Sequence, residues 1–293
     1  MSLLSKLGYI PKKKNELIAP SNLDCSDISI IIPVKNDQEG INRFLSVFFD
    51  TQQQYPKEII IVDNNSKPQI EIDSEFFKKK LPVTIMKCGK TGPASARNAG
   101  AMAARGEWII FTDSDCVPSE NFLIGYLRAL DGSVGYSGNV RSFGNDLLSR
   151  YYESQEILNP VKNRHQKPEY LVTANCMVWK HAFELIGGFN ESFNIAGGED
   201  IDMSFRLLNV GRLNSADSLV FHNFDDGLYG FAKRFYRYGL GNYIVSRQYG
   251  LDLLPKRFSP NEKSIVNYLL AHLQFFCLSM GYRRFLLEEP YLS

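Results

Sequence analysis

Four apolar runs of strand length, separated by segments of helical character, dominate the chain between residues 28 and 115. They read ISIIIPV from Ile28, EIIIVD from Glu58, PVTIMK from Pro82 and EWIIFTD from Glu107. Strands that are almost continuously apolar are buried on both faces, and their alternation with helices is typical of a parallel sheet. The sequence therefore predicts an α/β fold with a mostly parallel central sheet flanked by helices.

Two segments between these runs are predicted to be the covering helices, from about Gln38 to Thr51 and from about Pro93 to Arg105. The second opens with proline and is rich in alanine, which suits a helix start and close packing on a sheet. Ligands of such sheets bind beyond the carboxyl ends of the strands. Asp63 closes the second run and Asp113 the fourth, so we expect both side chains to point into one crevice.

Composition and missing motifs exclude several classes of function. No GxGxxG or GxxxxGK[ST] follows any of the predicted strands, which argues against a dinucleotide fold and a P-loop nucleoside triphosphatase. The formal net charge of +1 over 293 residues gives no reason to expect a nucleic-acid partner. The five cysteines are scattered and include no CxxC pair, which indicates a reducing, cytoplasmic setting rather than a zinc or redox centre.

The stretch SIVNYLLAHLQFFCLSMGY, from Ser264 to Tyr282, is apolar around most of its circumference but contains three polar interruptions. Because about 20 predominantly apolar residues are needed to cross a bilayer, this segment is marginal as a membrane span. It is predicted to be a helix that packs on the domain or faces a partner. Arg283 and Arg284 follow it directly and leave peripheral membrane contact as the alternative.

The stretch FTDSDCVP places Asp113 and Asp115 one residue apart at the end of an apolar run. Two carboxylates in a turn can bring oxygens to one hard cation, Mg²⁺ or Mn²⁺. Aspartate is also common in ordinary turns, because its side chain bonds to nearby backbone. The position at the end of a buried strand, near Asp63, favours the metal site.

A second acidic group, in GGEDIDMSF, contains Glu199, Asp200 and Asp202. Acidic residues in the first turn of a helix are stabilised by its dipole, and Asp202 can pair with Arg206 one turn later. Glu199 and Asp200 follow two glycines, which allow a sharp turn and leave a carboxylate facing a cleft.

Such a carboxylate could act as a general base toward a hydroxyl nucleophile. With an ordinary pKa of about 3.9 it must take the proton as the new bond forms, so the electrophile needs a good leaving group. A nucleoside diphosphate neutralised by a metal at the DSD turn is one such leaving group.

These motifs together resemble the inverting family 2 glycosyltransferases of GT-A fold, the fold of nucleotide-diphospho-sugar transferases. The resemblance covers about Ile28 to His222. It rests on six motifs in order: SIIIPVKN, IIIVDNNS, ASARNAG, FTDSD, IGGFNE and GGEDIDMSFRL.

The resemblance implies roles for the residues that bind the donor and the metal. Pro33 and Asp63 would contact the nucleotide base, with Asp63 accepting from a uracil ring NH. Arg97 would lie near the nucleotide or its diphosphate. Asp113 would approach the ribose and the metal, and Asp115 would be the direct metal ligand.

The resemblance also implies that Asp200 is the catalytic base and that Glu199 beside it helps to hold the acceptor. His222, in LVFHN, matches a place where related enzymes offer a third metal ligand. A histidine satisfied by a backbone carbonyl is an equal alternative.

Two departures from the family pattern matter. Asn64 stands where the family often has a second aspartate, and the QxxRW signature of processive synthases is absent; its nearest counterpart is KRFYRYG. Transfer of a single sugar is therefore favoured over polymerisation. The surrounding stretch YGFAKRFYRYGLGNY, from Tyr229, interleaves aromatic and basic residues, which fits a nucleic-acid surface when read alone. Within this fold, the alternatives are a cover over the cleft and an ordinary amphipathic helix.

The sequence thus predicts an N-terminal extension (1–27), a GT-A catalytic domain (28–226) and a helical C-terminal portion (227–293). The expected activity is metal-dependent, inverting transfer of one sugar, from a UDP-sugar in the first instance, to a glycan, lipid-linked or protein acceptor in glycan or polysaccharide biosynthesis. We expect a cytoplasmic protein; contact with the inner face of the membrane and homo-oligomerisation through the C-terminal helices stay open. The alternatives are a sugar-phosphate nucleotidyltransferase and a non-catalytic nucleotide-sugar-binding protein.

Overall fold

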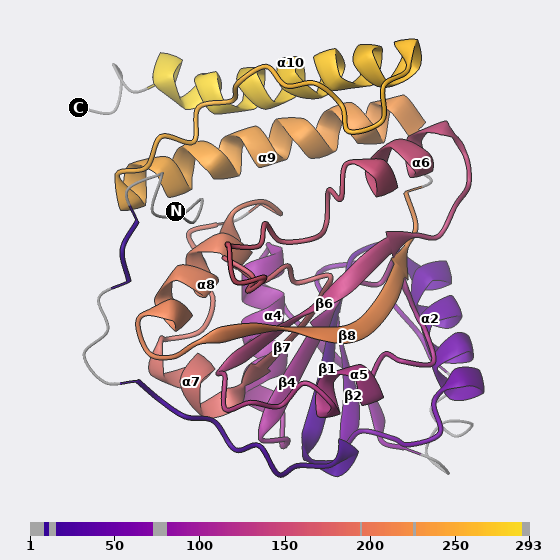
Figure 1. The fold of residues 1–293 in the computed structure, drawn as a ribbon. Coiled ribbons are helices and arrows are strands. Elements are labelled where there is room, and N and C mark those ends of the chain that lie inside the picture. The colour runs from indigo at the N-terminus through magenta and orange to yellow at the C-terminus, as the bar shows by residue number, and fades with distance from the viewer. Residues whose placement is uncertain (1–8, 12–15, 73–80, 194, 225–226, 289–293) are drawn as a thin grey trace.

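The four predicted strands form one half of the central sheet in the computed structural model (Figure 1). Strand β1 (Ile28–Val34) lies between β2 (Glu58–Asp63) and β4 (Trp108–Thr112), and β3 (Val83–Lys87) lies beyond β2; all three pairings are parallel. Every residue of β2 and β4 is buried, as their apolar sequences predict. The structure describes residues 9–11, 16–72, 81–193, 195–224 and 227–288.

The other half of the sheet mixes strand directions. Strand β7 (Asn175–Trp179) is antiparallel to β4, and β6 (Gly135–Ser142) is antiparallel to β7. Strand β8 (Leu213–His222) runs parallel to β6, and β5 (Cys116–Pro118) closes this edge antiparallel to β8. The eight strands lie in the order β3-β2-β1-β4-β7-β6-β8-β5. The predicted α/β fold is therefore confirmed.

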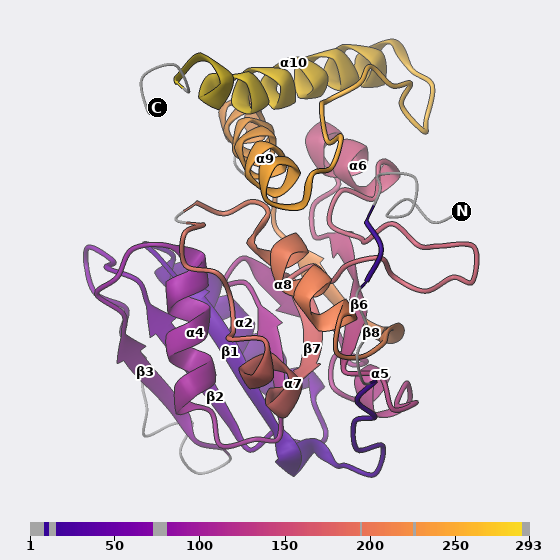
Figure 2. The same ribbon diagram turned by 90° about the vertical axis from the view of Figure 1, so that its left-hand side faces the viewer.

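Helices α2 (Gln38–Thr51) and α4 (Pro93–Ala103) cover opposite faces of the parallel strands (Figure 2). This follows from the strand order, because the β1-α2-β2 and β3-α4-β4 crossovers run in opposite directions along the sheet and share one hand. Helix α4 lies very close to the sheet: a side chain at Gly100 would come within 2.6 Å of Ile31.

Four shorter helices follow the parallel half. They are α5 (Ile124–Leu127), α6 (Leu147–Ser154), α7 (Lys180–Leu185) and α8 (Glu199–Leu208). Helix α7 comes directly after β7, and α8 begins at the GGED motif.

Two long helices, α9 (Gly227–Tyr249) and α10 (Ile265–Glu288), form an outer layer beyond α6 and α8 (Figures 1 and 2). They cross in backbone contact, because a side chain at Gly239 would overlap the carbonyl of Leu278 and one at Gly281 would overlap the carbonyl of Tyr236. Among the described residues, α10 is the one helix that is long and apolar enough to cross a membrane, over Ile265–Arg284.

The described part of the N-terminal extension lies along the domain. The backbone NH of Leu17 donates to the carbonyl of Val210 at 2.7 Å, and that of Ala19 donates to the carbonyl of Gly132 at 3.0 Å. Further back, the Tyr9 ring stacks on Phe205 with 4.3 Å between centroids. The segment is thus held by the body of the fold.

We predict that Gly281→Ala destabilises the protein by about 1–3 kcal/mol, because the new methyl group forces α9 and α10 apart. Chemical denaturation of the purified variant measures this free energy. Gly89→Ala is the matched control, since a side chain there meets no atom within 4 Å. The control should differ from the parent by less than about 0.5 kcal/mol. Equal stability of the two variants would contradict the tight crossing.

Candidate active site

A cavity of about 700 Å³ opens at the carboxyl ends of β1 and β4, below α9 and α10. Its walls come from the strand ends, the start of α4, the DSD turn and the GGED turn, which are far apart in sequence. Seven of the eight residues that the sequence singles out line it: Pro33, Arg97, Asp113, Asp115, Glu199, Asp200 and His222.

Arg97, in the second turn of α4, joins the two acidic motifs. Its guanidinium donates to Asp113 Oδ1 at 2.8 Å and to Glu199 Oε1 at 3.0 Å, and its side chain is only 4% exposed. Burial lowers the pKa of Arg97, but these two carboxylates outweigh that effect and raise the pKa above its ordinary value. Arg97 therefore stays charged and holds the DSD turn and the GGED turn to the same side of the cavity.

The middle residue of the DSD turn fixes its shape. Ser114 Oγ donates to Asp37 Oδ2 at 2.6 Å, and Asp37 caps α2 by accepting from the backbone NH of Gly40 at 2.9 Å. From the other side, the NH of Asn223 donates to the carbonyl of Asp115 at 2.8 Å. The turn is thus held by α2 and by the end of β8, and both aspartates face the cavity.

Sheet register brings His222 to Asp115. Antiparallel pairing of β5 with β8 sets His222 opposite Cys116, the residue after Asp115. As a result, His222 Nε2 lies 3.3 Å from Asp115 Oδ2. His222 Nδ1 is buried without a hydrogen-bond partner in the described part of the chain. The metal ligand and the ring satisfied by a backbone carbonyl both stay predictions for His222.

The chemistry of this pair fits a divalent cation. Burial lowers the pKa of His222 more than Asp115 raises it, so the ring is neutral, which is the form that binds metals. Desolvation raises the pKa of Asp115, and its Oδ1 is buried without a hydrogen-bond partner among the described residues. Ligand atoms of Asp115, Cys116 and His222 lie within 4.8 Å of one another. The Cys116 thiol donates to the carbonyl of Ala174 at 3.6 Å. The two groups that face each other are therefore the Asp115 carboxylate and the His222 imidazole.

The GGED turn depends on its glycines. Gly198 has φ +90°, a left-handed conformation, and a side chain at Gly197 would come within 2.9 Å of the Arg237 carbonyl on α9. Because these glycines have no side chains, the backbone of α9 can come close to the start of α8. Glu199 accepts from the NH of Gly197 at 2.7 Å as well as from Arg97. Its carboxylate is therefore engaged within the turn, while Asp200 follows it at the cavity wall.

Asp200 has the strongly shifted pKa that a base at neutral pH requires. Burial raises the pKa of its carboxyl to about 7, with a further contribution from Glu199 and an opposing one from Arg97. The ordinary carboxyl pKa of about 3.9, which the sequence alone suggests for Asp200, is therefore wrong for this residue in the folded protein. A carboxylate with a pKa of about 7 is a much better proton acceptor and is still substantially ionised at neutral pH.

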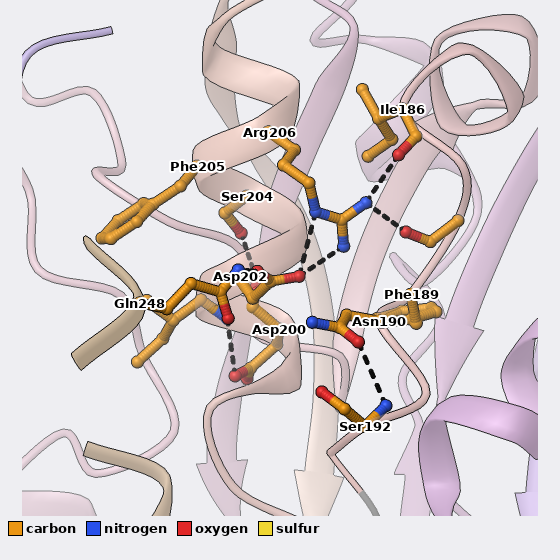
Figure 3. Close-up of polar contacts among 12 residues, drawn as sticks. Ile186, Phe189, Asn190, Ser192, Asp200, Asp202, Ser204, Phe205, Arg206 and Gln248 are labelled. Carbon is orange, nitrogen blue, oxygen red and sulfur yellow. Dashed lines mark hydrogen bonds and ion pairs between the residues drawn. The ribbon is translucent and has the colours of Figure 1, made fainter. Parts of the chain in front are cut away.

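Asp202, two residues further along α8, joins neighbouring elements through its hydrogen bonds (Figure 3). Arg206 Nε donates to its Oδ2 at 3.0 Å, which confirms the pairing predicted one turn apart. Gln248 Nε2 and Tyr249 OH of α9 donate to its other oxygen at 2.6 Å and 2.7 Å. Arg206 also donates to the carbonyls of Ile186 and Gly188 in the IGGF turn. Asp202 therefore ties α8 to α9.

Asp63 does not share the cavity with Asp113, contrary to expectation. Its carboxylate accepts from the NH of Ser66 at 2.8 Å and of Ile70 at 3.3 Å, and it lines a separate hollow at the end of β2. Burial raises the pKa of Asp63, but these hydrogen bonds outweigh it and lower the pKa. The loop after β2 curls back over the carboxylate and turns it away. Contact with a nucleotide base stays a prediction for this residue.

Asn64, for which the sequence predicts no role in the site, lines the cavity instead. Its Nδ2 donates to the carbonyls of Cys88, at 3.2 Å, and Lys90, at 2.7 Å, and its Oδ1 accepts from the NH of Gly92 at 2.9 Å. Asn64 thereby fixes the loop that leads into α4 and sets the position of Arg97. An aspartate could not donate these two bonds.

The C-terminal helices supply a wall that the motifs did not reveal. Arg234, Arg237 and Tyr238 of α9 line the cavity, as do Gln274 and Leu278 of α10. This supports the alternative in which the aromatic and basic stretch from Tyr229 covers the cleft. Helical spacing of the two arginines, three residues apart, is the signal that could have placed them on one face.

Comparison with known proteins identifies the family of the chain. Residues 29–184 match the family model described as glycosyl transferase family 2, and residues 108–288 match that of glycosyl transferase family group 2. Pre-mycofactocin glycosyltransferase of Mycobacterium tuberculosis (strain ATCC 25618 / H37Rv) is 27% identical over 202 residues, which are 66% of this chain and 41% of that protein. The chain thus spans less than half of that relative.

Two solved structures are similar in fold. Mannosyltransferase PcManGT from Pyrobaculum calidifontis, in complex with GDP-Man and Mn²⁺, has a TM-score of 0.56 and 15% identity, over 96% of this chain and 80% of that one. S. aureus TarS 1–349, in complex with UDP-GlcNAc, has a TM-score of 0.52 and 19% identity, over 77% of this chain and 67% of that one. These likenesses show the GT-A fold, and the family models show that the chain belongs to glycosyltransferase family 2.

Proposed function

We propose that this glycosyltransferase moves one sugar from a UDP-sugar to an acceptor hydroxyl, with inversion at the anomeric carbon and with Mg²⁺ or Mn²⁺ bound. The observation that carries the proposal is the cavity that holds Asp115 and His222 together with Asp200, whose pKa is raised to about 7. A metal-binding pair and a tuned base in one cavity are the two groups that such a transfer needs. The neighbours in complex with UDP-GlcNAc and with GDP-Man and Mn²⁺ support the donor class and the metal.

In this mechanism Asp200 accepts the proton of the acceptor hydroxyl while that oxygen forms a bond to the anomeric carbon. The bond from this carbon to the diphosphate oxygen breaks, and its electron pair leaves with the nucleoside diphosphate. A single displacement inverts the configuration. Pro33 at the cavity wall and Asp63 in the neighbouring hollow are proposed for the nucleotide base, and Glu199 supports the acceptor side by fixing the GGED turn.

The metal would be held by Asp115 and His222, with Asp113 beside them. A bound divalent cation supplies charge neutralisation for the departing diphosphate. Arg97 keeps Asp113 in place through its 2.8 Å ion pair, so the carboxylate can serve the ribose and the metal without rotating away. Arg234 and Arg237 add positive charge on the α9 wall, where the diphosphate would lie.

Asp200→Asn should lower kcat by about 10² to 10⁴ while donor binding is unchanged, because the amide keeps the shape and cannot accept the proton. Turnover is measured as nucleoside diphosphate released from the nucleotide sugar; release of pyrophosphate from a triphosphate would instead indicate nucleotidyl transfer. Asp202→Asn is the comparison variant, which should lose stability through its contacts with α9 rather than through the chemical step. Near-normal turnover of folded Asp200→Asn would remove this residue from the mechanism.

The pH profile should report the raised pKa of Asp200. Only the ionised carboxylate accepts a proton, so kcat/KM should fall about tenfold per pH unit below about 7 and level off above it. Initial rates under donor-limited conditions give the profile. The residual rate of Asp200→Asn should lack this acidic limb. A wild-type profile that stays flat well below neutral pH would contradict the assignment.

Thermal unfolding should reveal metal-linked donor binding. UDP at about 100 times its dissociation constant should add about 2.7 kcal/mol of stability in the presence of Mn²⁺. Asp115→Asn should lose the Mn²⁺-dependent part of this gain and keep the part due to UDP alone. Asp217→Asn, an exposed aspartate outside the cavity, is the matched control and should behave as wild type. An unchanged Mn²⁺ effect in Asp115→Asn would exclude this metal site.

A further inference from the structure

Helix α10 carries a second apolar face that the active site does not use. Its inner face lies against α9 and lines the cavity with Gln274 and Leu278. Its outer face points away from the protein, and Figures 1 and 2 show α10 as the outermost layer of the fold. Four large side chains recur on that face at helical spacing: Ile265 is 82% exposed, Leu269 66%, Phe276 60% and Met280 51%.

Exposed His272 and Arg283 lie on the same face, so the stripe is apolar with two polar positions. Its clustered apolar side chains indicate an interaction, since isolated exposed apolar residues are common but clusters of them are not. Leu254 and Phe258, in the segment that joins α9 to α10, are also exposed, at 42% and 39%. This segment lies beside the helix, because the Arg257 guanidinium sits over the Phe275 ring at 5.8 Å from its centroid.

Basic residues surround the stripe. From residue 252 to the end of α10 at Glu288 the chain has five lysines and arginines and three acidic residues, a net charge of +2, and one of the acidic residues, Asp252, pairs with Lys256 at 2.9 Å. All five cations are exposed: Lys256, Arg257, Lys263, Arg283 and Arg284. An apolar helix face flanked by cations complements a surface that is apolar below and negative at its rim.

We propose that the outer face of α10, together with the 252–264 segment, docks on the surface of an anionic phospholipid bilayer. The apolar stripe lies among the lipid acyl chains at the interface, and the cations meet the negative head groups. This binding is independent of glycosyl transfer. It sets the α10 wall of the cavity about 10 Å, one helix diameter, from the lipid.

The helix lies on the bilayer rather than across it. The hydroxyl of buried Tyr151 donates to Gln274 Oε1 at 2.8 Å, and Gly281 is in backbone contact with Tyr236 of α9. A membrane span would break these contacts and expose polar Gln274 to the hydrocarbon, where a lost hydrogen bond is costly.

A second copy of the chain fits this face less well. Pairing of two helices along α10 would use positions spaced alternately by four and three residues, namely 265, 269, 272, 276, 279 and 283. Half of these are polar, His272, Ser279 and Arg283, and would be buried between two helices, whereas at a bilayer surface they can reach the head groups. Two copies would also bring segments of net charge +2 together.

Vesicle flotation of the full chain tests the proposal. We expect the protein to float with vesicles of phosphatidylcholine containing about 30% phosphatidylglycerol, and to bind pure phosphatidylcholine at least about tenfold more weakly. The double variant Leu269→Asp/Phe276→Asp should lose at least about tenfold in binding to the anionic vesicles. Lys263→Gln/Arg283→Gln should weaken binding by about fivefold for each cation removed.

Met102→Asp/Leu185→Asp is the matched control, since both side chains are exposed, at 85% and 58%, but lie on α4 and α7. It should float as wild type does, and circular dichroism should show that all variants are folded. Equal flotation of wild type and Leu269→Asp/Phe276→Asp would overturn the proposal. Absence of wild-type flotation would do so too, as would a dimer in light scattering that Leu269→Asp/Phe276→Asp converts to monomer.

Discussion

The site depends on one buried cation. Arg97 comes from α4, Asp113 from the end of β4 and Glu199 from the start of α8, and the two ion pairs of Arg97 hold these three elements at fixed positions. A buried guanidinium without both partners would carry a large desolvation cost, so the fold is most stable when the two acidic motifs are brought together. Asn64 belongs to the same arrangement, because its three hydrogen bonds position the loop from which α4 starts.

Acidic residues that look alike in the sequence differ in their burial and in their hydrogen-bond partners. In the GGEDID stretch, Glu199 is committed to Arg97 and the Gly197 NH, and Asp202 to Arg206 and α9. Asp200 lies between them and accepts only from the NH of Ile201 among the described hydrogen bonds, so its carboxylate is left for chemistry. Few donors and strong desolvation together explain why the pKa of this carboxylate rises to about 7.

Local patterns in the sequence predicted much of this structure, and long-range geometry accounts for what they missed. Helix α2 has the predicted bounds, the four apolar runs are strands, and Asp202 pairs with Arg206 because helix spacing alone determines that contact. The hollow around Asp63 could not be foreseen, because it depends on how the loop after β2 folds back. The closeness of His222 and Asp115 was predicted only through the family resemblance, since local patterns do not determine the register of β5 against β8.

The C-terminal helices belong to the active site more closely than the boundary near residue 227 suggests. Helix α9 is in backbone contact with the GGED turn at Gly241 and with α10 at Gly239, so no side chain lies between these elements to absorb a shift. The same helices form the cavity wall opposite the sheet, and burial is the main cause of the raised pKa of Asp200. The raised pKa of Asp200 is therefore a property of the sheet, of α8 and of the two C-terminal helices together. Because α10 lines the cavity with Gln274 and Leu278 and exposes Leu269 and Phe276 on its other side, any contact made by the exposed face lies about one helix diameter from the cavity that desolvates Asp200.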